Sequence, residues 1–463
     1  MSNLQITVSP IDDSNYVSRE QASSQQISHC SESAFTAQKQ WREVSIAERA
    51  KICYKMIDLF VAQKEQIGKE LTWMMGRPIR YAQGEVAGMQ ERALHMIDIA
   101  EQSLATVKLE DKPGFTRYIK RVPLGVVFVI APWNFPYMTA INAIMPAIMA
   151  GNSVILKHSA QTPLCAERLY QAFDEAGLPK GVFQFLHLSH DATASLIQDP
   201  KIDHVCFTGS VDAGASVEKS AAGRFIGLGL ELGGKDPAYI RADVDLDAAV
   251  ETVIDGAFFN SGQSCCGIER IYVDATIHDQ FIEKACALIN QYQLGRPDDS
   301  NTTLGPMVKA SAADFVREQI KQAVAQGATA HIDENNFPMS KPGSAYLAPQ
   351  LLSNVDHNMM VMTQESFGPV VGVQKVDSDQ QAIALMNDSE FGLTASIFTR
   401  DIETGIALGE QLETGTFFIN RCDYLDPALA WTGVKNSGRG CTLSSMGYEQ
   451  LTRPKSFHIK TEL

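Results

Sequence analysis

The stretch GVVFVIAPWNFPYMTAINAIMPAIMAGNSVILKHS, residues 125–159, decides the fold class. Residues 125–132 predict a buried strand, residues 137–150 an apolar helix that ends at Gly151, and residues 153–159 a second strand. Two strands joined by one helix form a βαβ unit, in which the strands lie parallel. This stretch therefore predicts an α/β protein with a parallel sheet.

The same alternation continues along the chain. Further strands are expected at 182–188, 204–210 and 226–232, with helices at 163–176 and 211–222. After residue 233, strands are expected at 270–273, 368–376, 395–399 and 415–420, with helices at 243–260, 277–291, 314–326, 378–386 and 402–410. The pattern changes over near Gly233 and Gly234, which indicates two α/β halves.

Two segments lie outside this alternation. Residues 104–121, around the sequence KPG, predict an inserted hairpin, and residues 452–460 predict a strand-like tail. We therefore divide the chain into a first domain of residues 1–103 and 122–232, a second of residues 233–435, and an arm and tail of residues 104–121 and 436–463.

The composition limits the possible functions. The chain has 463 residues, of which 45% are hydrophobic and 20% charged, as in ordinary globular proteins. Its formal net charge of -15 argues against nucleic acid and anionic membranes as partners. The most apolar segment, residues 138–150, is too short to span a bilayer, and residues 1–20 resemble neither a signal nor a transit peptide. We expect a cytoplasmic protein.

The nine cysteines are expected to be free thiols in a reducing cytosol. They form no Cys-x-x-Cys pair, and the sequence contains no His-Glu-x-x-His, so we expect no metal site. Cys265 and Cys266 are neighbours in FNSGQSCCGIER, residues 259–270, and a disulfide between them would need a strained ring. They are either a nucleophile and its neighbour or two small buried thiols, and this stretch alone favours the latter.

The glycine pattern gives only a general indication of a nucleotide. No Gly-x-Gly-x-x-Gly is present, and in GLGLELGG the third glycine falls out of step. FTGSVDAG combines a strand end, a tight turn and a helix start, whose backbone N–H groups can hold a phosphate. The polar clusters APWN, LKHS and FTGS all follow predicted strands, where parallel sheets bind ligands.

Five motifs together resemble the NAD(P)-dependent aldehyde dehydrogenase superfamily and stand in its order. They are APWNFP at 131–136, FTGS at 207–210, LELGGKDP at 230–237, FFNSGQSC at 258–265 and ESFGPVV at 365–371. The resemblance extends over roughly residues 40–460. It implies a Rossmann-like cofactor-binding domain, a second α/β catalytic domain and a small β oligomerisation arm. It also implies a homodimer or homotetramer that acts on a small-molecule aldehyde with NAD or NADP.

The resemblance assigns three catalytic residues. Cys265 corresponds to the nucleophile, which attacks an aldehyde to form a thiohemiacetal and then a thioester. Glu231 corresponds to the general base that activates the hydrolytic water, and Asn134 to the oxyanion donor. Without the resemblance, Glu231 reads as part of a surface ion pair and Asn134 as an Asx turn.

The cofactor residues follow from the same matching. Trp133 and Ser210 resemble pyrophosphate contacts, Lys157 an adenosine-ribose contact, Glu365 a nicotinamide-ribose contact, and Phe367 an aromatic beside that ring. Ser159 and Ala160 follow Lys157 in one turn, and Gly209 precedes Ser210 in another, so we expect these three residues to contact the cofactor as well. Ala160 stands where NAD-preferring relatives often have an acid that repels a 2′-phosphate, so we expect both cofactors to work.

The substrate is less defined. Phe259 stands where relatives that oxidise succinic semialdehyde often have an arginine. With Tyr137, Cys266, Tyr424 and Trp431 it predicts an apolar, partly aromatic pocket for a medium-chain or aromatic aldehyde. Arg421 is either a carboxylate anchor for a succinic-semialdehyde-type substrate or a surface residue. The chain could also be a coenzyme-A-acylating relative or a non-catalytic binding relative. Near the C-terminus, CTLSSMG replaces a common Arg-Glu, a change that we interpret as affecting packing only.

Overall fold

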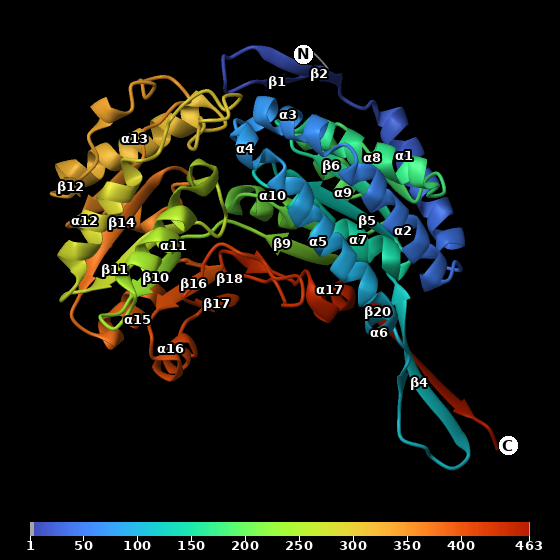
Figure 1. Ribbon diagram of the computed structural model, residues 1–463. Helices are drawn as coiled ribbons and strands as arrows, with labels where there is room; N and C mark the ends of the chain where they lie inside the picture. Colours follow the sequence, from blue (N-terminus) through green and yellow to red (C-terminus); the bar gives the residue numbers. More distant parts are fainter. Residues whose placement is uncertain (1–3, 463) are drawn as a thin grey trace.

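The predicted βαβ unit of residues 125–159 lies at the centre of the first lobe of the molecule. The computed structural model describes residues 4–462, which form two lobes and a projecting arm (Figure 1). The first sheet has the strand order β19-β9-β8-β5-β6-β7. Its strands are β5 (Val126–Ala131), β6 (Ser153–His158), β7 (Phe183–Phe185), β8 (Ile202–Thr208), β9 (Gly227–Glu231) and β19 (Gly438–Arg439). All neighbours run parallel except β19, which pairs antiparallel with β9.

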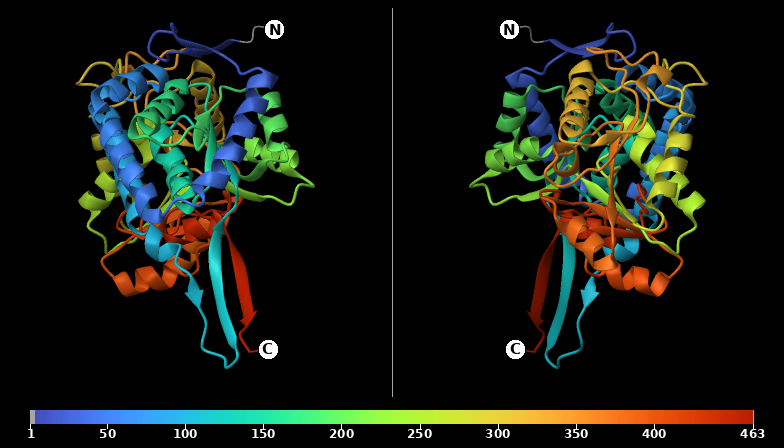
Figure 2. Two further views of the ribbon diagram at one scale, coloured as in Figure 1. Left: turned by 90° about the vertical axis from the view of Figure 1, so that its right-hand side faces the viewer. Right: turned by 90° about the vertical axis from the view of Figure 1, so that its left-hand side faces the viewer.

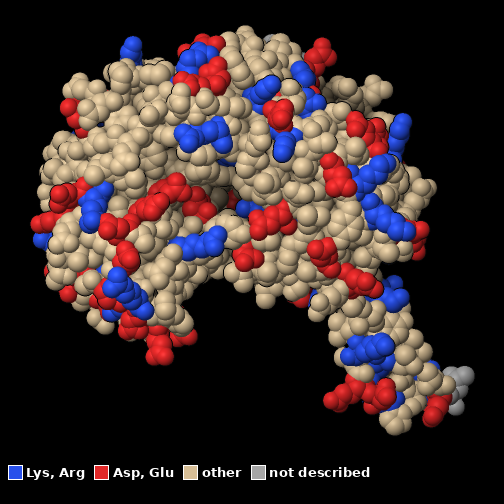
Figure 3. All heavy atoms as spheres, viewed as in Figure 1, with Lys and Arg blue, Asp and Glu red and all other residues tan. Residues whose placement is uncertain are grey.

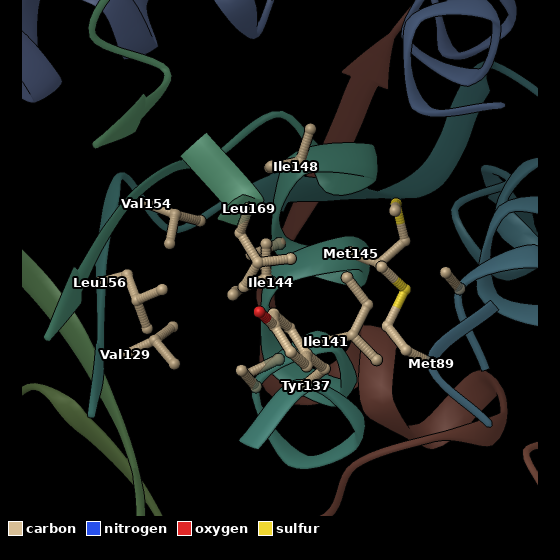
Figure 4. Packing of buried hydrophobic residues seen from close by; sticks show 14 of the residues in the cluster. Met89, Val129, Tyr137, Ile141, Ile144, Met145, Ile148, Val154, Leu156 and Leu169 are labelled. Carbon is tan, nitrogen blue, oxygen red and sulfur yellow. The ribbon is translucent and has the colours of Figure 1, made fainter. Parts of the chain in front are cut away.

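Helices cover both faces of this sheet, which explains why β5 is buried along its whole length. They are α7 (Pro136–Ala150), α8 (Pro163–Ala176), α9 (His190–Ile197) and α10 (Val211–Ala221). Pro136 occupies the first turn of α7, and Gly151 ends the helix with a φ of 92°. Figure 4 shows Tyr137, Ile144 and Ile148 on the α7 side of this core, opposite Val129 and Leu156 of the sheet.

The N-terminal hundred residues form a hairpin and a helical layer that the sequence analysis did not predict. The hairpin consists of β1 (Leu4–Val8) and β2 (Asn15–Glu20). The helices are α1 (Ser24–Trp41), α2 (Ile46–Val61), α3 (Lys64–Met75), α4 (Ile79–Ala82), α5 (Gly84–Asp98) and α6 (Ala100–Ser103). Ser23 with Gln26 and Ser45 with Glu48 form capping boxes that begin α1 and α2.

The second lobe is built on another mostly parallel sheet, with the order β12-β13-β14-β11-β10-β16-β17. Its strands are β10 (Asp236–Ile240), β11 (Ile268–Asp274), β12 (Thr329–Ala330), β13 (Gln350–Ser353), β14 (Val370–Val376), β16 (Thr394–Phe398) and β17 (Thr416–Ile419). Its helices are α11 (Leu246–Phe258), α12 (His278–Ile289), α13 (Ala310–Ala325), α14 (Met360–Thr363), α15 (Asp379–Asn387) and α16 (Ile402–Gly409), with 3-10 turns at Phe259–Gly262 and Glu334–Asn336. The α/β class with parallel sheets is confirmed.

The arm is a narrow sheet of order β20-β4-β3 that projects from the first lobe (Figures 1 and 2). It consists of β3 (Val107–Lys108), β4 (Phe115–Pro123) and β20 (Thr452–Lys460), and β20 pairs with β4 from Thr452↔Pro123 to Lys460↔Phe115. Residues 436–451 lie elsewhere: β19 extends the first sheet and α17 (Ser444–Gln450) packs near α7, while β15 (Phe391–Gly392) and β18 (Val434–Lys435) form a small ladder. The division into domains stays a prediction.

Candidate active site

A cavity of about 790 Å³ opens between the lobes. Of the predicted site residues, Glu231, Phe259, Cys265, Cys266, Tyr424 and Trp431 line it. Glu231 ends β9 of the first sheet, whereas Cys265 follows α11 of the second lobe. Figure 3 shows acidic side chains gathered beside the hollow between the lobes, and Glu251 and Asp255 are among the residues that line the cavity. The structure therefore brings the predicted nucleophile and base to one place.

The loop that carries Cys265 is held by close backbone approaches. Asn260 and Ser261 have positive φ angles of 53° and 57°, which turn the chain sharply after α11. The Gln263 amide donates to the Asn260 carbonyl, and its Oε1 accepts the N–H of Val308 at 2.8 Å. A side chain at Gly234 would overlap the carbonyl oxygen of Cys265. The second glycine of LELGG therefore lets the two lobes meet at the nucleophile.

Asn134 lies beside this loop at the start of α7. It is 4% exposed, and its amide donates to the Gln263 carbonyl at 3.3 Å. The backbone carbonyl of Asn134 accepts hydrogen bonds from the side chains of Arg77 at 2.6 Å and of Asn260 at 3.3 Å. The side-chain amide of Asn134 therefore makes one hydrogen bond within residues 4–462, to the loop that carries Cys265, and has a second N–H to donate.

Arg77 and Glu85 form a buried ion pair that fixes this corner, at 2.5 Å. Glu85 also accepts the backbone N–H groups of Tyr137 and Met138 at 2.9 and 3.0 Å, and so caps the N-terminus of α7. The sequence analysis did not identify either residue. Only an unusual charge pair, Arg-Pro with an acid eight residues later, marks them in the sequence.

The carboxylate of Glu231 is held by two hydroxyl groups. Thr208 donates to it at 3.1 Å and Thr442 at 2.5 Å. Burial raises the pKa of Glu231 above its ordinary value, and the two hydroxyl groups oppose that shift. Thr442 belongs to CTLSSMG, so this segment, which the sequence led us to interpret as one of packing, also contacts the predicted general base.

Cys266 is chemically distinct from Cys265. It is 3% exposed, and its thiol donates to Asp423 at 3.0 Å, while Ser264 donates to the same oxygen at 2.9 Å. A hydrogen bond with Cys265, burial and the Asp423 carboxylate together raise the pKa of Cys266 well above its ordinary value. Burial also raises the pKa of Asp423 to about 6. Cys266 is therefore a protonated thiol in the cavity wall.

The predicted nicotinamide-ribose contact lies on a clamped loop. Glu269 accepts the N–H groups of Ser366 and Phe367 at 2.8 and 2.9 Å, and pairs with the buried Lys235 at 2.5 Å. Glu365 precedes this clamp, and its Oε1 accepts the Gly234 N–H at 2.9 Å, where the chain passes from the first lobe to the second. Burial raises the pKa of Glu365 to about 7.

The other predicted cofactor residues lie at strand ends of the first sheet. Lys157 is half-buried at the end of β6, and burial lowers its pKa; its ammonium makes no hydrogen bond or ion pair with residues 4–462. Ser210 begins α10, and Gly209 precedes it. Trp133 meets Phe367 edge to face with ring centroids 5.7 Å apart. An unpaired lysine, a helix N-terminus and the free oxygen of Glu365 fit the phosphates and ribose hydroxyls of a dinucleotide.

The turn after β6 carries Ser159 and Ala160. Ser159 accepts the N–H of Gln161 at 3.2 Å, and Ala160 is exposed. The Ala160 carbonyl accepts a hydrogen bond from Thr7 at 2.8 Å, so the N-terminal hairpin braces this turn. His158, beside Lys157, is 2% exposed and contacts the Pro136 carbonyl. Burial lowers its pKa to about 3, so it adds no positive charge.

Two predicted pocket residues lie outside the cavity. Tyr137 lies in the first turn of α7 and is fully buried, because this turn faces the core (Figure 4). Its ring centroid lies 4.9 Å from that of Phe60. Arg421 is exposed and stacks on Tyr424 at 3.7 Å. The expectation that Tyr137 lines the pocket was therefore wrong, and of the two readings of Arg421 the structure agrees with the surface residue.

Arg92 of α5, which the sequence analysis missed, is the cation that lines the cavity. It is 8% exposed, and its Nη1 donates to the Met138 carbonyl at 3.0 Å and to Asn142 at 3.5 Å. Within the described chain it forms no ion pair, and its Nε and Nη2 make no hydrogen bond. Asn142 lines the same cavity, and its Nδ2 has no partner among residues 4–462. These groups form an unpaired, buried donor set.

Known proteins with similar sequences are aldehyde dehydrogenases. The model of the aldehyde dehydrogenase family matches residues 2–457. The succinate semialdehyde dehydrogenase [NAD(P)+] Sad of Escherichia coli is 34% identical over 89% of this chain and 88% of its own length. A succinate-semialdehyde dehydrogenase [NADP(+)] of Mycobacterium tuberculosis is 33% identical over 90% and 92%.

A solved structure is similar along the whole chain. Succinic semialdehyde dehydrogenase from Streptococcus pyogenes, in complex with NADP+, superimposes with a TM-score of 0.93 at 29% identity, covering 98% of this chain and 100% of the other. The fold, the motifs and the family model agree, and the chain belongs to the aldehyde dehydrogenase family.

Proposed function

We propose that this enzyme oxidises an aldehyde that carries a carboxylate at its other end, through an acyl group on Cys265. Aldehyde oxidation with NAD or NADP is the activity of the family to which the chain belongs. The unpaired Arg92 in the cavity is the observation that supports an acid-bearing substrate.

The first half-reaction forms a bond between the Cys265 sulfur and the aldehyde carbon. The thiol proton passes to Glu231, and the amide of Asn134 with the Cys265 N–H stabilises the oxygen that becomes negative. A nicotinamide cofactor, which Lys157, Glu365 and the N-terminus of α10 would hold, would supply the acceptor for the hydride of this carbon. What stays on Cys265 is a thioester.

The second half-reaction hydrolyses the thioester. Glu231 takes a proton from water as the water oxygen attacks the acyl carbon, and the thiolate of Cys265 leaves. The two threonine hydroxyls hold the carboxylate of Glu231 in place for this step. The presence of a placed base supports hydrolysis rather than transfer of the acyl group to coenzyme A.

The substrate class follows from the charge of the donor set. Burying a guanidinium without a carboxylate to pair with is unfavourable, and a bound substrate carboxylate would reduce that cost. The relatives from Escherichia coli and Mycobacterium tuberculosis are succinate-semialdehyde dehydrogenases, which is consistent with an acid-bearing substrate. A medium-chain or aromatic aldehyde is the second candidate, because Phe135, Phe259, Tyr292, Tyr424 and Trp431 also line the cavity.

A single variant separates these two substrates. Arg92→Met keeps the length of the side chain and removes its charge. We expect kcat/KM for succinic semialdehyde to fall by about 100-fold, or about 2.7 kcal/mol, whereas kcat/KM for hexanal changes by less than about threefold. An equal loss for both aldehydes would argue for a structural role of Arg92 and against an acid-bearing substrate.

A second variant tests the acyl-enzyme. In Glu231→Gln we expect the first turnover to release reduced cofactor as a burst, while steady turnover falls by about 100-fold or more because hydrolysis lacks its base. Stopped-flow absorbance measures both phases, with and without coenzyme A. Normal steady turnover in this variant would remove Glu231 from the mechanism, and acceleration by coenzyme A would identify an acylating enzyme.

We also propose a cytoplasmic location and a homodimer or homotetramer. All nine cysteines, which lie within residues 4–462, are free thiols. No helix in the described part of the chain is long and apolar enough to cross a membrane.

A further inference from the structure

The cavity between the lobes contains charged side chains of both signs that do not pair with one another. Arg92 of α5 and Asn142 of α7 line it from the first lobe, and we call them the donor wall. Glu251 and Asp255 of α11 and Asp423, which follows β17, line it from the second lobe, and we call them the acid wall. Within residues 4–462, neither Arg92 nor any of these three acids forms an ion pair.

The donor wall has free hydrogen-bond donors that are removed from bulk solvent. Arg92 is 8% exposed and Asn142 is 1% exposed. The Nε and Nη2 of Arg92 and the Nδ2 of Asn142 make no hydrogen bond with residues 4–462. Buried donors in folded proteins nearly always have a partner. These two side chains therefore indicate a ligand with acceptor oxygens, which in the proposed function is the carboxylate of the substrate.

The acid wall has free acceptors on the same cavity. Oδ1 of Asp423 accepts hydrogen bonds from Ser264 at 2.9 Å and from Cys266 at 3.0 Å, whereas its Oδ2 accepts none from residues 4–462. Burial raises the pKa of Asp423 to about 6, and the charge of Asp255 adds to that rise. Burial and the charge of Glu251 likewise raise the pKa of Asp255. A cation bound between these carboxylates would oppose both shifts, because it stabilises the ionised forms.

The sequence of α11 places two of these acids together. Glu251 and Asp255 are four residues apart in ETVIDGAF, so they lie one turn apart on the same face of the helix. Two like charges at this spacing disfavour a helix. Of the described residues that line the cavity, Arg92 alone is a lysine or arginine, and it lies on the opposite lobe. Helix formation therefore does not explain this pair of acids, whereas a bound cation does.

We propose that the substrate is an amino-acid semialdehyde, in which one carbon carries both a carboxylate and an ammonium group. The carboxylate binds Arg92 and Asn142, and the ammonium binds Asp423 and Asp255, so the two walls hold that carbon from opposite sides. The aldehyde at the other end of the molecule reaches Cys265 and is oxidised by the same two half-reactions. This inference rests on the proposed function and adds the ammonium group to its substrate.

Of the four charge patterns that the far end of the substrate can have, the zwitterion alone satisfies both walls. A carboxylate alone leaves the acid wall without a cation and is repelled by its three negative charges. An ammonium alone leaves the guanidinium of Arg92 without an anion, and an uncharged end leaves both walls unpaired. The aromatic side chains of the cavity agree with a zwitterion, because the face of an aromatic ring attracts an ammonium group.

Stable product acids test the two walls without turnover, which avoids the condensation of an amine with an aldehyde in the substrate itself. Butyrate, glutarate, 4-aminobutyrate and L-glutamate share one chain, and their far ends carry no charge, the carboxylate, the ammonium and both groups, respectively. A second set with one more carbon, pentanoate, adipate, 5-aminopentanoate and L-2-aminoadipate, allows for the length of the cavity. Isothermal titration calorimetry in the presence of NADP+ measures each Kd.

In at least one set we expect the acid with both groups to bind at least about tenfold more tightly than each of the other three. Asp423→Asn keeps an acceptor oxygen but removes the charge, so the gain from the ammonium should fall to less than about twofold. Asp255→Asn should reduce the same gain. The matched control is Asp426→Asn, which removes an equal charge from an exposed side chain outside the cavity and should leave every Kd unchanged.

Three results would overturn the ammonium site. These are equal binding of the acids with and without the ammonium in both sets, tightest binding of the acid that has the ammonium alone, and a gain from the ammonium that survives in both Asp423→Asn and Asp255→Asn. Arg92→Met keeps the proposed function separate, since it should weaken only the acids with a far carboxylate. If Arg92→Met weakens glutarate or adipate while the ammonium has no effect, the proposed function stands and only the ammonium site is refuted. If Arg92→Met binds these acids as the wild type does, the proposed acid-bearing substrate itself fails.

Discussion

Two adjacent thiols differ because one carboxylate contacts only one of them. Both thiols line the cavity, but Asp423 accepts a hydrogen bond from Cys266 alone. The five motifs predicted Cys265, Glu231 and Asn134 as site residues, because each motif is a short local pattern. Arg92, Thr442 and Asp423 could not be found that way, since they reach the site from α5 and from the C-terminal segment through tertiary packing.

This difference predicts selective alkylation. At pH 7, iodoacetamide should modify Cys265 and leave Cys266 unmodified. In the Cys265→Ala variant, Cys266 should stay nearly unlabelled. Adding Asp423→Asn to Cys265→Ala removes the negative charge beside Cys266 and should speed its labelling by about tenfold, the effect of one pKa unit on the thiolate fraction. Peptide mass spectrometry measures the labelling. Equal labelling of the two wild-type thiols would contradict this assignment.

Glu231 predicts a pH dependence. The proposed base would act only when ionised, and burial raises the pKa of Glu231, so hydrolysis should become faster as pH rises through that pKa and then reach a plateau. Thr442 donates to the ionised form and lowers the pKa, so Thr442→Val should move the rising limb to higher pH. Profiles of kcat against pH for the two proteins measure the shift. A limb that moves to lower pH would contradict the role of the hydroxyl.

Ala160 predicts tolerance of both cofactors. An acid within about 4 Å of the 2′-phosphate would oppose each of its charges by about 4 kcal/mol at an effective dielectric of roughly 20. Ala160 is exposed and adds no such charge, and Lys157 is unpaired nearby. We expect the kcat/KM values for NAD and NADP to differ by less than about 100-fold, and Ala160→Glu to penalise NADP alone. Wild-type rejection of NADP by many thousandfold would mean that another residue guards the ribose.

At the scale of elements, local pattern explains which strands and helices were predicted. Helices with clear start and stop residues, such as α7 and α8 with proline at the start and glycine at the end, were found almost to the residue. The strand β10 at Asp236–Ile240 was missed because Pro237 and a short apolar run argue against a strand. It forms because neighbours on both sides pair with it, and Thr394 satisfies its buried Asp236 at 2.6 Å.

The contact between α5 and α7 predicts a stability difference between two ion pairs. Arg77→Met leaves Glu85 buried without its partner and should lower the free energy of unfolding by about 3–5 kcal/mol. Arg19→Met breaks the partly exposed pair with Glu167 and should cost about 1 kcal/mol or less. Urea denaturation compares the two. Equal losses would mean that the buried pair does not fix the start of α7.

At the scale of the whole molecule, the site exists only where the lobes meet. The first sheet supplies Glu231 and the predicted dinucleotide contacts, while the second lobe supplies Cys265 and Glu365. The sequence predicted two α/β halves but not their relative position, because that depends on close approaches such as Gly234 against the Cys265 carbonyl. A motif at a strand end therefore indicates which residues react, and packing between lobes decides which residues surround them.

The arm predicts the assembly. Its strands extend from the first lobe with little of the molecule behind them, and Val107, Leu109 and Ile459 are 43%, 45% and 44% exposed. Open strand edges with apolar side chains favour pairing with another chain, so we expect sedimentation at micromolar concentration to show a dimer or tetramer.

Placing a charge on this surface should dissociate the assembly, because the charge would be buried without a partner on association. Val107→Lys combined with Ile459→Lys should therefore shift the sedimentation coefficient towards the monomer. Ile406→Lys, at an equally exposed apolar position of 50% on α16, is the matched control and should leave the assembly unchanged. A wild-type protein that is a stable, active monomer, or a double variant that stays assembled, would show that the arm does not join subunits.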